Sequence, residues 1–457
     1  MEVTEKPRIE RLRTEREPVL RARIGALFPL DAAGKIGRRR VALGMAFVAL
    51  TAAASLARQS GPGALNSIWA EDGITFYQAT FHQDVLHALF TPNNGYLQLL
   101  PRIIIPVVAL FPISWAAGLM AVAGALASSA CALLVYHASA ALVPSRVARL
   151  CIALPTAILL FGESEVGNSV VNVQWYLIFT AFWMMLWNPR TRARRALAAV
   201  VLFIAIGSDP LALMFVPLLA LRLWSRPVRE SAWQIGGIAA GVLLQGVAML
   251  RGSLASRPPT HDYSVPFALH GYVRYVIGTT LVSTRELRHF GLSQPVDAKV
   301  IGVLTILLIA IAAFLLANRG GNWPLAVICA VFSLGFFCIT TMQGGSYNDR
   351  YAVPPILLLI TALAVLSSST TQRAAPRQSA AIAIAYAPLV VLCALVGANL
   401  VANYHGGSPE RAAQPSWSSQ LANGRAACRT DGITSARLQT APGGGWFVTA
   451  PCSRLLK

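Results

Sequence analysis

Two neighbouring acids, Glu71 and Asp72, are the side chains whose type and position most suggest chemistry. They follow Trp69 in the run 67–73, soon after the first long apolar stretch. Carboxylates are scarce here, because 55% of the chain is hydrophobic and only 12% is charged. An acid kept at a membrane is costly and is therefore often functional. A partly desolvated carboxylate in this position would suit a general base acting on a hydroxyl group.

Glu71 and Asp72 should point in different directions, because neighbours on a helix do not share a face. We therefore expect at most one of them to face a site, and we favour Asp72 as the base. The competing interpretation is structural: Asp72 would cap a helix over 73–81 and interact with its dipole. The sequence leaves both interpretations open.

A second polar strip begins at Asn168 and Asn172, which are four residues apart and would share one face of a helix, approximately with Trp175. Amides beside an aromatic plane can hold a sugar through hydrogen bonds and stacking. They can equally satisfy one another between membrane helices. Glu163 would either join this site or cap the preceding turn. The candidates for binding a sugar or an acceptor are Trp69, Asn94, Tyr96, Glu163, Asn168, Asn172, Gln174 and Trp175.

Three arginines are candidates for a phosphate, because the planar guanidinium fits phosphate oxygens. Arg102 lies in an apolar segment, where a buried cation needs an anionic partner. Arg350 precedes an apolar run, and its alternative role is an interfacial anchor paired with Asp349. Arg274 lies in a semi-apolar stretch, where the alternative is a solvated basic face over lipid headgroups.

Long apolar runs recur along nearly the whole chain, which indicates a polytopic helical membrane protein. The runs are continuous, whereas barrel strands would alternate, so we predict an all-α fold. Basic residues in short connections should be cytoplasmic, as should the basic N-terminal segment 1–40. The net charge of +19 is then mainly a topology signal and an attraction to anionic lipid, and we expect no nucleic-acid partner.

This pattern predicts about eleven crossings, with the N-terminus cytoplasmic and the C-terminus outside the cell membrane. We expect segment 1–40 to be disordered, the membrane domain to cover 41–402 and an external tail to cover 403–457. Long outer loops are expected at 59–98 and 251–299. The segment 97–142 is too short for three spans, so we predict that it crosses the membrane once and that 97–111 forms a re-entrant helix. The predicted spans are 41–58, 115–142, 147–161, 173–187, 196–207, 210–224, 232–250, 300–317, 324–342, 351–367 and 380–402.

Cys428 and Cys452 are the two cysteines of the tail, 24 residues apart in the sequence. An oxidising outer compartment would let them form a disulfide, and the alternative is two free thiols. The remaining cysteines fall in apolar runs, where they behave as small hydrophobic residues. No cysteine or histidine cluster has zinc-ligand spacing, and we expect neither a metal nor another cofactor.

Taken together, these features resemble the GT-C membrane glycosyltransferases, and in detail a group of actinobacterial-type GT-C-like membrane proteins. The resemblance covers most of 41–457 and implies a polyprenyl-phosphate-linked sugar as donor, transfer at the outer face and an acid of the first loop as base. Glu71 or Asp72 takes the base position, and Arg102 or Arg350 the phosphate position. The matching stretches are Trp-Ala-Glu-Asp-Gly at 69–73, Asn-Asn-Gly-Tyr-Leu-Gln-Leu-Leu-Pro-Arg at 93–102, Gly-Asn-Ser-Val-Val-Asn-Val-Gln-Trp at 167–175, Ser-Asp-Pro at 208–210, Asp-Arg-Tyr at 349–351 and Pro-Cys-Ser-Arg at 451–454.

The first loop has Glu-Asp side by side and lacks an Asp-x-Asp motif, which favours metal-independent transfer. The predicted function is an inverting membrane glycosyltransferase acting on an envelope glycan or glycoprotein. Two alternatives are a transporter or flippase of lipid-linked glycans and a non-catalytic envelope scaffold. Against a transporter, we find no internal repeat with paired broken helices, and the polar residues concentrate on one face of the membrane.

Overall fold

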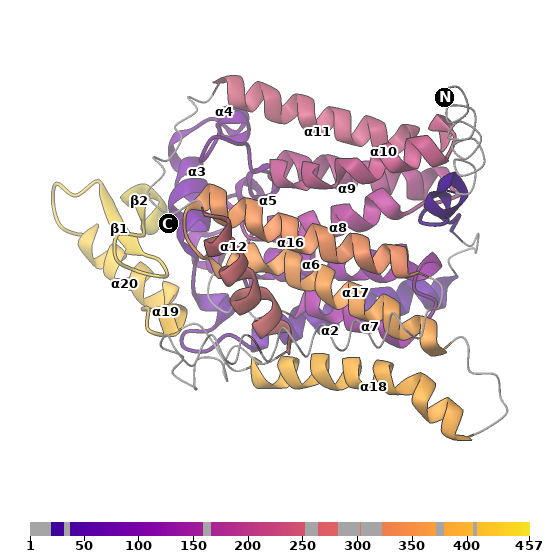
Figure 1. Ribbon diagram of the computed structural model, residues 1–457. Helices are drawn as coiled ribbons and strands as arrows, with labels where there is room; N and C mark the ends of the chain where they lie inside the picture. The colour runs from indigo at the N-terminus through magenta and orange to yellow at the C-terminus, as the bar shows by residue number, and fades with distance from the viewer. Residues whose placement is uncertain are drawn as a thin grey trace, which may run out of the picture.

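The computed structural model describes residues 20–31, 37–158, 166–251, 264–281, 302, 322–371, 379–404 and 409–457. Within these ranges the chain is mostly helical (Figure 1). A helix lies at each predicted span that falls inside them, whereas 300–317 lies outside them except for residue 302. The helices at the predicted spans are α2 (Arg38–Ala57), α6 (Ala116–Ala138), α7 (Arg146–Ala157), α8 (Val173–Leu186), α9 (Arg192–Ser208), η5 (Pro210–Phe215) continuing into α10 (Val216–Ser225), α11 (Ala232–Arg251), α16 (Trp323–Gly344), α17 (Val353–Thr371) and α18 (Ser379–Ala402).

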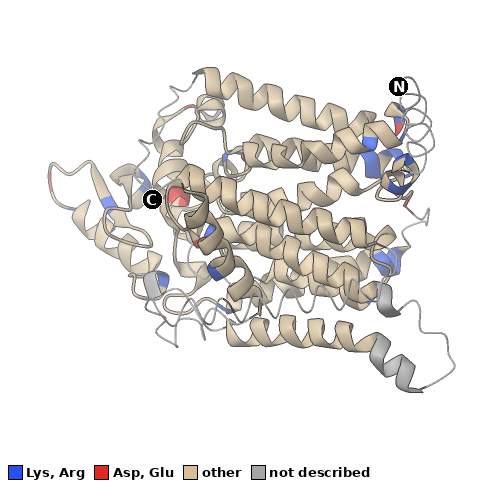
Figure 2. Cartoon of the chain, in the orientation of Figure 1, with Lys and Arg blue, Asp and Glu red and all other residues tan. Residues whose placement is uncertain are grey.

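Within the ranges given above, five stretches of helix are long and apolar enough to cross a membrane, which is the property expected of a multi-pass membrane protein. Charged residues gather toward the two ends of the bundle, and the middle of its helices is nearly free of them (Figure 2). An uncharged band between charged ends is the arrangement that a bilayer requires. The five stretches are Arg38–Ala57, Ile113–Ala141, Ala232–Leu250, Trp323–Gly344 and Asp349–Ser368.

Helix α8 forms the centre of the bundle, because every one of its side chains is buried. Helix α17 is nearly as enclosed. In the apolar stretch Asp349–Ser368, which contains most of this helix, 94% of the residues of an 18-residue segment are buried inside the protein. Around α8, an aromatic cluster joins Phe182 to Phe215 and Phe332, with ring centroids 5.4 and 6.3 Å away. A helix that is apolar on all sides belongs in such a core.

One end of the bundle is held by Arg222, whose buried guanidinium donates hydrogen bonds to the carbonyl oxygens of Met185, Trp187 and Glu230. Residues 20–31 pack here as well, although they fall in the segment expected to be disordered. Phe28 is fully buried, and Asp31 forms an ion pair with Arg194 at 2.6 Å. An apolar side chain and a charge pair thus join these residues to the bundle.

The opposite end of the bundle carries the predicted outer loop 59–98, called the first loop below. It contains short helices in place of irregular chain. They are η1 (Ala64–Asn66), the π-helix η2 (Asp72–Tyr77), α3 (Ala79–His82) and α4 (Val85–Phe90). The apolar segment after them forms α5 (Leu99–Val108), ten residues and about 15 Å long. That length is about half of a bilayer core. The described part of the predicted outer loop 251–299 is also helical, in α12 (Val265–Gly271), η7 (Tyr272–Gly278) and α13 (Thr279–Leu281).

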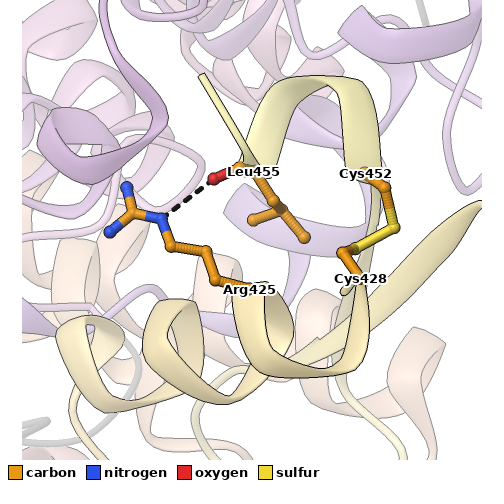
Figure 3. Close-up of a disulfide and its surroundings, with 4 residues drawn as sticks. All are labelled: Arg425, Cys428, Cys452 and Leu455. Carbon is orange, nitrogen blue, oxygen red and sulfur yellow. Dashed lines mark hydrogen bonds between the residues drawn. A yellow bond between two sulfur atoms is a disulfide. The ribbon is translucent and has the colours of Figure 1, made fainter. Parts of the chain in front are cut away.

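The tail forms a small module beside this same end (Figure 1). It contains α19 (Pro409–Ala412), α20 (Trp417–Ala427), an antiparallel pair of strands, β1 (Ser435–Gln439) and β2 (Phe447–Pro451), and α21 (Cys452–Leu455). The strands correct the all-α prediction for the tail only. The predicted disulfide between Cys428 and Cys452 is confirmed, and nearby Arg425 donates to the carbonyl of Leu455 at 2.9 Å (Figure 3).

The tail and the first loop share one hydrophobic core, which is separate from the core around α8. From the loop come Trp69, Phe76 and Tyr77, and from the tail Trp417 and Leu438 among others. The Trp417 indole also donates to the carbonyl of Ile113 at 2.9 Å. The predicted boundary at 403 therefore separates two parts of the sequence that fold against each other.

Candidate functional site

Asp72 is buried at the base of the first loop, with only 2% of its surface exposed. It begins η2, a π-helix, and such wide turns occur often at functional sites. Its carboxylate oxygens accept hydrogen bonds from the backbone N–H groups of Val170 and Val171, at 3.0 and 2.8 Å. The carboxylate thus joins the first loop to the turn that precedes α8.

These contacts bear on the interpretation that Asp72 caps the helix that follows it. The side chain bonds a segment almost one hundred positions away in the sequence, and it does not cap its own helix. Glu71 is half-buried whereas Asp72 is buried, so the neighbouring acids meet different surroundings, as expected for adjacent positions on a helical turn.

Burial raises the pKa of the Asp72 carboxyl from its ordinary 3.8 to about 6. The hydrogen bonds from Val171, Ser169 and Val170 and the charge of Arg411 act in the opposite direction. Desolvation disfavours the charged form, and donors and cations favour it. The carboxylate is therefore ionised at neutral pH but holds a proton more readily than a surface acid, which suits a general base.

Arg411 brings a positive charge from the tail to this acid. It is 2% exposed, its Nη1 donates to Gln59 Oε1 at 2.9 Å, and its guanidinium carbon lies 4.8 Å from the centre of the Trp69 ring. Burying an arginine is costly unless anions and acceptors surround it. Arg411 was not among the predicted site residues, because nothing in a polar tail indicates which distant residue an arginine meets.

The tail hairpin continues this contact along the loop. Ala441 exchanges two backbone hydrogen bonds with the loop, accepting from Ala70 at 2.6 Å and donating to Ile68 at 3.0 Å. Gly73 faces the same hairpin: a Cβ there would lie 3.0 Å from methyl groups of both Thr440 and Val448. The residues on both sides of Glu71 and Asp72 are therefore fixed by the tail.

The polar strip is arranged differently from its prediction. Residues 166–172 form turns, α8 begins only at Val173, and Asn168 has a positive φ of 54°, so Asn168 and Asn172 do not share a helix face. Asn168 instead exchanges two hydrogen bonds with Ser55, both at 2.9 Å. Asn172 is buried and bonds Ser169 and the Trp175 indole. Both amides hold the turn that donates to Asp72.

A second buried carboxylate, Asp209, belongs to a further group at this end, the Asp209 cluster, which comprises Tyr96, Gln98, Gln174, Asp209 and Arg350. The Tyr96 hydroxyl accepts a hydrogen bond from Gln98 at 2.9 Å, and it also hydrogen-bonds the side-chain amide of Gln174. The charges of Asp209 and Arg350 both reach Tyr96. Tyr96, Gln174 and Arg350, which were predicted separately, thus come together with the acid of the Ser-Asp-Pro stretch at 208–210.

Burial raises the pKa of Asp209 to about 7, against the hydrogen bond that it accepts from Leu211 at 2.9 Å and the positive charge of Arg350. Asp209 follows α9 and caps η5, a role that Asp before Pro commonly has. That motif indicates a turn, and only the fold brings the turn to Tyr96.

The other predicted residues have local roles in the structure. Arg102 is buried and donates to the backbone carbonyls of Leu97 and Ala88, with its guanidinium 5.1 Å from the Phe76 ring centre. Asn94 is exposed in a turn with φ 54°. Arg274 lies half-buried on η7 beside Tyr275.

Glu163 lies outside the residues that the structure describes. Within those residues, no three side chains of His, Cys, Asp or Glu are placed to hold a metal ion. No protein-family model matches the chain. No curated protein is detectably similar to it in sequence.

Proposed function

We propose that this protein is a membrane glycosyltransferase, which moves a sugar from a polyprenyl-phosphate carrier to an envelope glycan or glycoprotein at the outer face of the membrane. The observation that carries the proposal is Asp72, a buried acid whose pKa is raised to about 6 at one end of a membrane-type helix bundle. Such a group is ionised near neutral pH and accepts a proton readily.

The proposal includes about eleven crossings, with the N-terminus cytoplasmic and the tail outside. It is supported by the separation of the bundle's two ends. Arg194 and Arg222 lie at one end with the N-terminal segment, and the acid pair lies at the other with the tail. The disulfide of the tail fits an oxidising outer compartment.

In the proposed reaction, an acceptor hydroxyl attacks the anomeric carbon of the carrier-linked sugar. Its proton passes to the Asp72 carboxylate as the new C–O bond forms. The bond between the anomeric carbon and the phosphate oxygen breaks, and polyprenyl phosphate leaves with the electron pair. Attack opposite the leaving group inverts the anomeric centre. The positive charge of Arg102 or Arg350 offsets the negative charge that develops on the departing phosphate, so no metal is required.

The test measures sugar transfer by the full-length protein in membranes. The donor is the pool of radiolabelled lipid-linked sugars from a strain that lacks this protein. Asp72→Asn should reduce transfer by at least about a hundredfold, the usual range for losing a general base. Glu71→Gln should have a smaller effect. Asp84→Asn, which removes an exposed acid from the same loop, serves as the control. Full transfer by the Asp72→Asn, Glu71→Gln double variant would refute the assignment.

A further inference from the structure

The strongest unassigned feature is the Asp209 cluster, because it combines a buried acid with unused hydrogen-bonding capacity. Asp209 is 3% exposed and accepts a hydrogen bond from the Leu211 N–H, whereas a carboxylate has about four acceptor positions. The Oε1 atom of Gln174 is buried and has no hydrogen-bond partner, with the side chain only 5% exposed. Buried acceptors without donors are rare in proteins and point to a missing partner.

The position of the cluster is set by backbone contacts. The Leu100 N–H donates to Ser208 Oγ at 3.1 Å, which holds the end of the first loop against the turn that contains Asp209. Gln245 fixes the same junction, since it accepts from Leu97 N–H and donates to the carbonyls of Ile206 and Gly207. The site is therefore built by rigid helix ends, which is what a binding site needs.

The cluster combines buried acceptors with less buried aromatic and cationic side chains. Tyr96 and Arg350 are half-buried, whereas Asp209 and Gln174 are buried. Next to them, Tyr351 packs edge to face with Trp175, with centroids 5.6 Å apart, and the Arg350 guanidinium lies 5.6 Å from the Tyr351 ring centre. A half-buried aromatic ring such as that of Tyr96 can pack against the C–H groups of a sugar.

The charge of the cluster distinguishes an uncharged ligand from a phosphate. Ionised Asp209 and Arg350 bring one negative and one positive charge, and with Asp209 in this form the group as a whole is nearly neutral. A phosphate would face the Asp209 carboxylate at close range, and like charges at a buried site are costly. Hydroxyl groups can donate to Asp209 and to Gln174 Oε1 and can accept from Arg350 and Tyr96.

We propose that the Asp209 cluster binds an uncharged sugar ring, whose hydroxyls donate to Asp209 and Gln174 beside Tyr96. The assignment of this sugar as a reactant rests on the proposed glycosyltransferase function. It moves Arg350 from a phosphate-binding role to a sugar-binding role.

The test uses the full-length protein in detergent and saturation-transfer NMR with a panel of methyl glycosides of neutral hexoses and pentoses. At least one glycoside should bind at concentrations up to about 10 mM, the range of weak single-site binding. Asp209→Asn and Gln174→Leu should each weaken binding about tenfold, because each removes an acceptor for a ligand hydroxyl. Asp431→Asn, which removes an exposed acid of the tail, should leave it unchanged. Inorganic phosphate should not displace the glycoside.

The inference is overturned if no glycoside of the panel binds, or if both variants bind as wild type does. It is also overturned if phosphate displaces the sugar and binds more tightly to Asp209→Asn. Asp209→Glu keeps the carboxylate and should retain more binding than Asp209→Asn, which separates a ligand role from a folding defect. If the wild type binds the glycoside but transfers no sugar, the proposed function is refuted and this inference is not. If the wild type transfers sugar and both cluster variants bind the glycoside as the wild type does, this inference is refuted and the proposed function is not.

Discussion

The guanidinium of Arg411 lies over the Trp69 indole, 4.8 Å from the ring centre, and donates from Nη1 to Gln59 at 2.9 Å. A residue of the tail is thereby fixed against the loop that contains Glu71 and Asp72. The contact combines a cation over an aromatic face with a hydrogen bond in a buried setting, where both interactions are stronger than at the surface. The electrostatics of Asp72 therefore depend on whether the tail is docked.

The pH dependence of transfer should follow the ionisation of Asp72. A base must be deprotonated to act, and the pKa of this carboxyl is raised to about 6 by burial. Transfer by wild type should rise as pH increases through 6 and level off above about pH 7. Initial rates in buffers of constant ionic strength measure this profile. A rate that is flat between about pH 5 and 7 would contradict the role of Asp72.

Arg411→Gln should move that profile to higher pH. The Arg411 charge lowers the pKa of Asp72, so its loss raises that pKa further and leaves less of the acid ionised at pH 6. Transfer should fall more at pH 6 than at pH 8, where wild type and variant both remain ionised. Arg429→Gln, which removes an exposed arginine of the same tail, is the matched control. An equal loss at both pH values would indicate a folding effect and not an electrostatic one.

Replacing both Cys428 and Cys452 by serine should loosen the tail. The disulfide closes a loop of 24 residues, and the chain-entropy model assigns such a loop about 3 kcal/mol of stability. Limited proteolysis should then cut the tail much faster than in wild type, while the helical circular dichroism of the bundle is preserved. Cys338→Ser, which removes a half-buried free thiol, should leave proteolysis unchanged. Equal protection of the tail in the double variant would disprove a stabilising role.

Gly73→Val should undock the hairpin from the first loop. A Cβ at this position would lie 3.0 Å from the methyl groups of both Thr440 and Val448, which is closer than carbon atoms normally pack. Overpacking of this kind usually costs about 1–3 kcal/mol. Hydrogen exchange of 435–451 should accelerate, measured by mass spectrometry. Gly246→Ala, at a position with open space around it, should show no such change.

The helices of the bundle could be predicted because a membrane span has a strong sequence signal in its length and apolar composition. The disulfide could be predicted because only two cysteines lie outside apolar runs. The arrangement of Asn168 was mispredicted, because a spacing of four residues implies a shared face only if the backbone is helical. The Gly-Asn pair at 167–168 is a local turn signal that would have indicated the correct backbone, since Asn adopts positive φ more readily than most residues.

The composition of the site was less predictable than its location. Asp72 stands out in the sequence because acids are rare, but its partners, Val170 and Val171, act through their backbone and carry no side-chain signal. Arg102 satisfies backbone carbonyls of its own loop, a role that an arginine in an apolar segment shares with a ligand-binding one. Contacts between distant segments are a property of the fold, so no local pattern could assign them.

The hydrogen bond between Gln59 and Arg411 joins residues 352 positions apart. During synthesis, the loop with the acid pair leaves the ribosome long before Arg411 is made. For that whole period Asp72 lacks its neighbouring cation, and Trp69 lacks the module that covers it. A chain that stops early, or whose tail is clipped by a protease, would keep its helical bundle and lose the surroundings of its carboxylate. Asp72 therefore reaches its final environment only after the tail has been made and has docked on the loop.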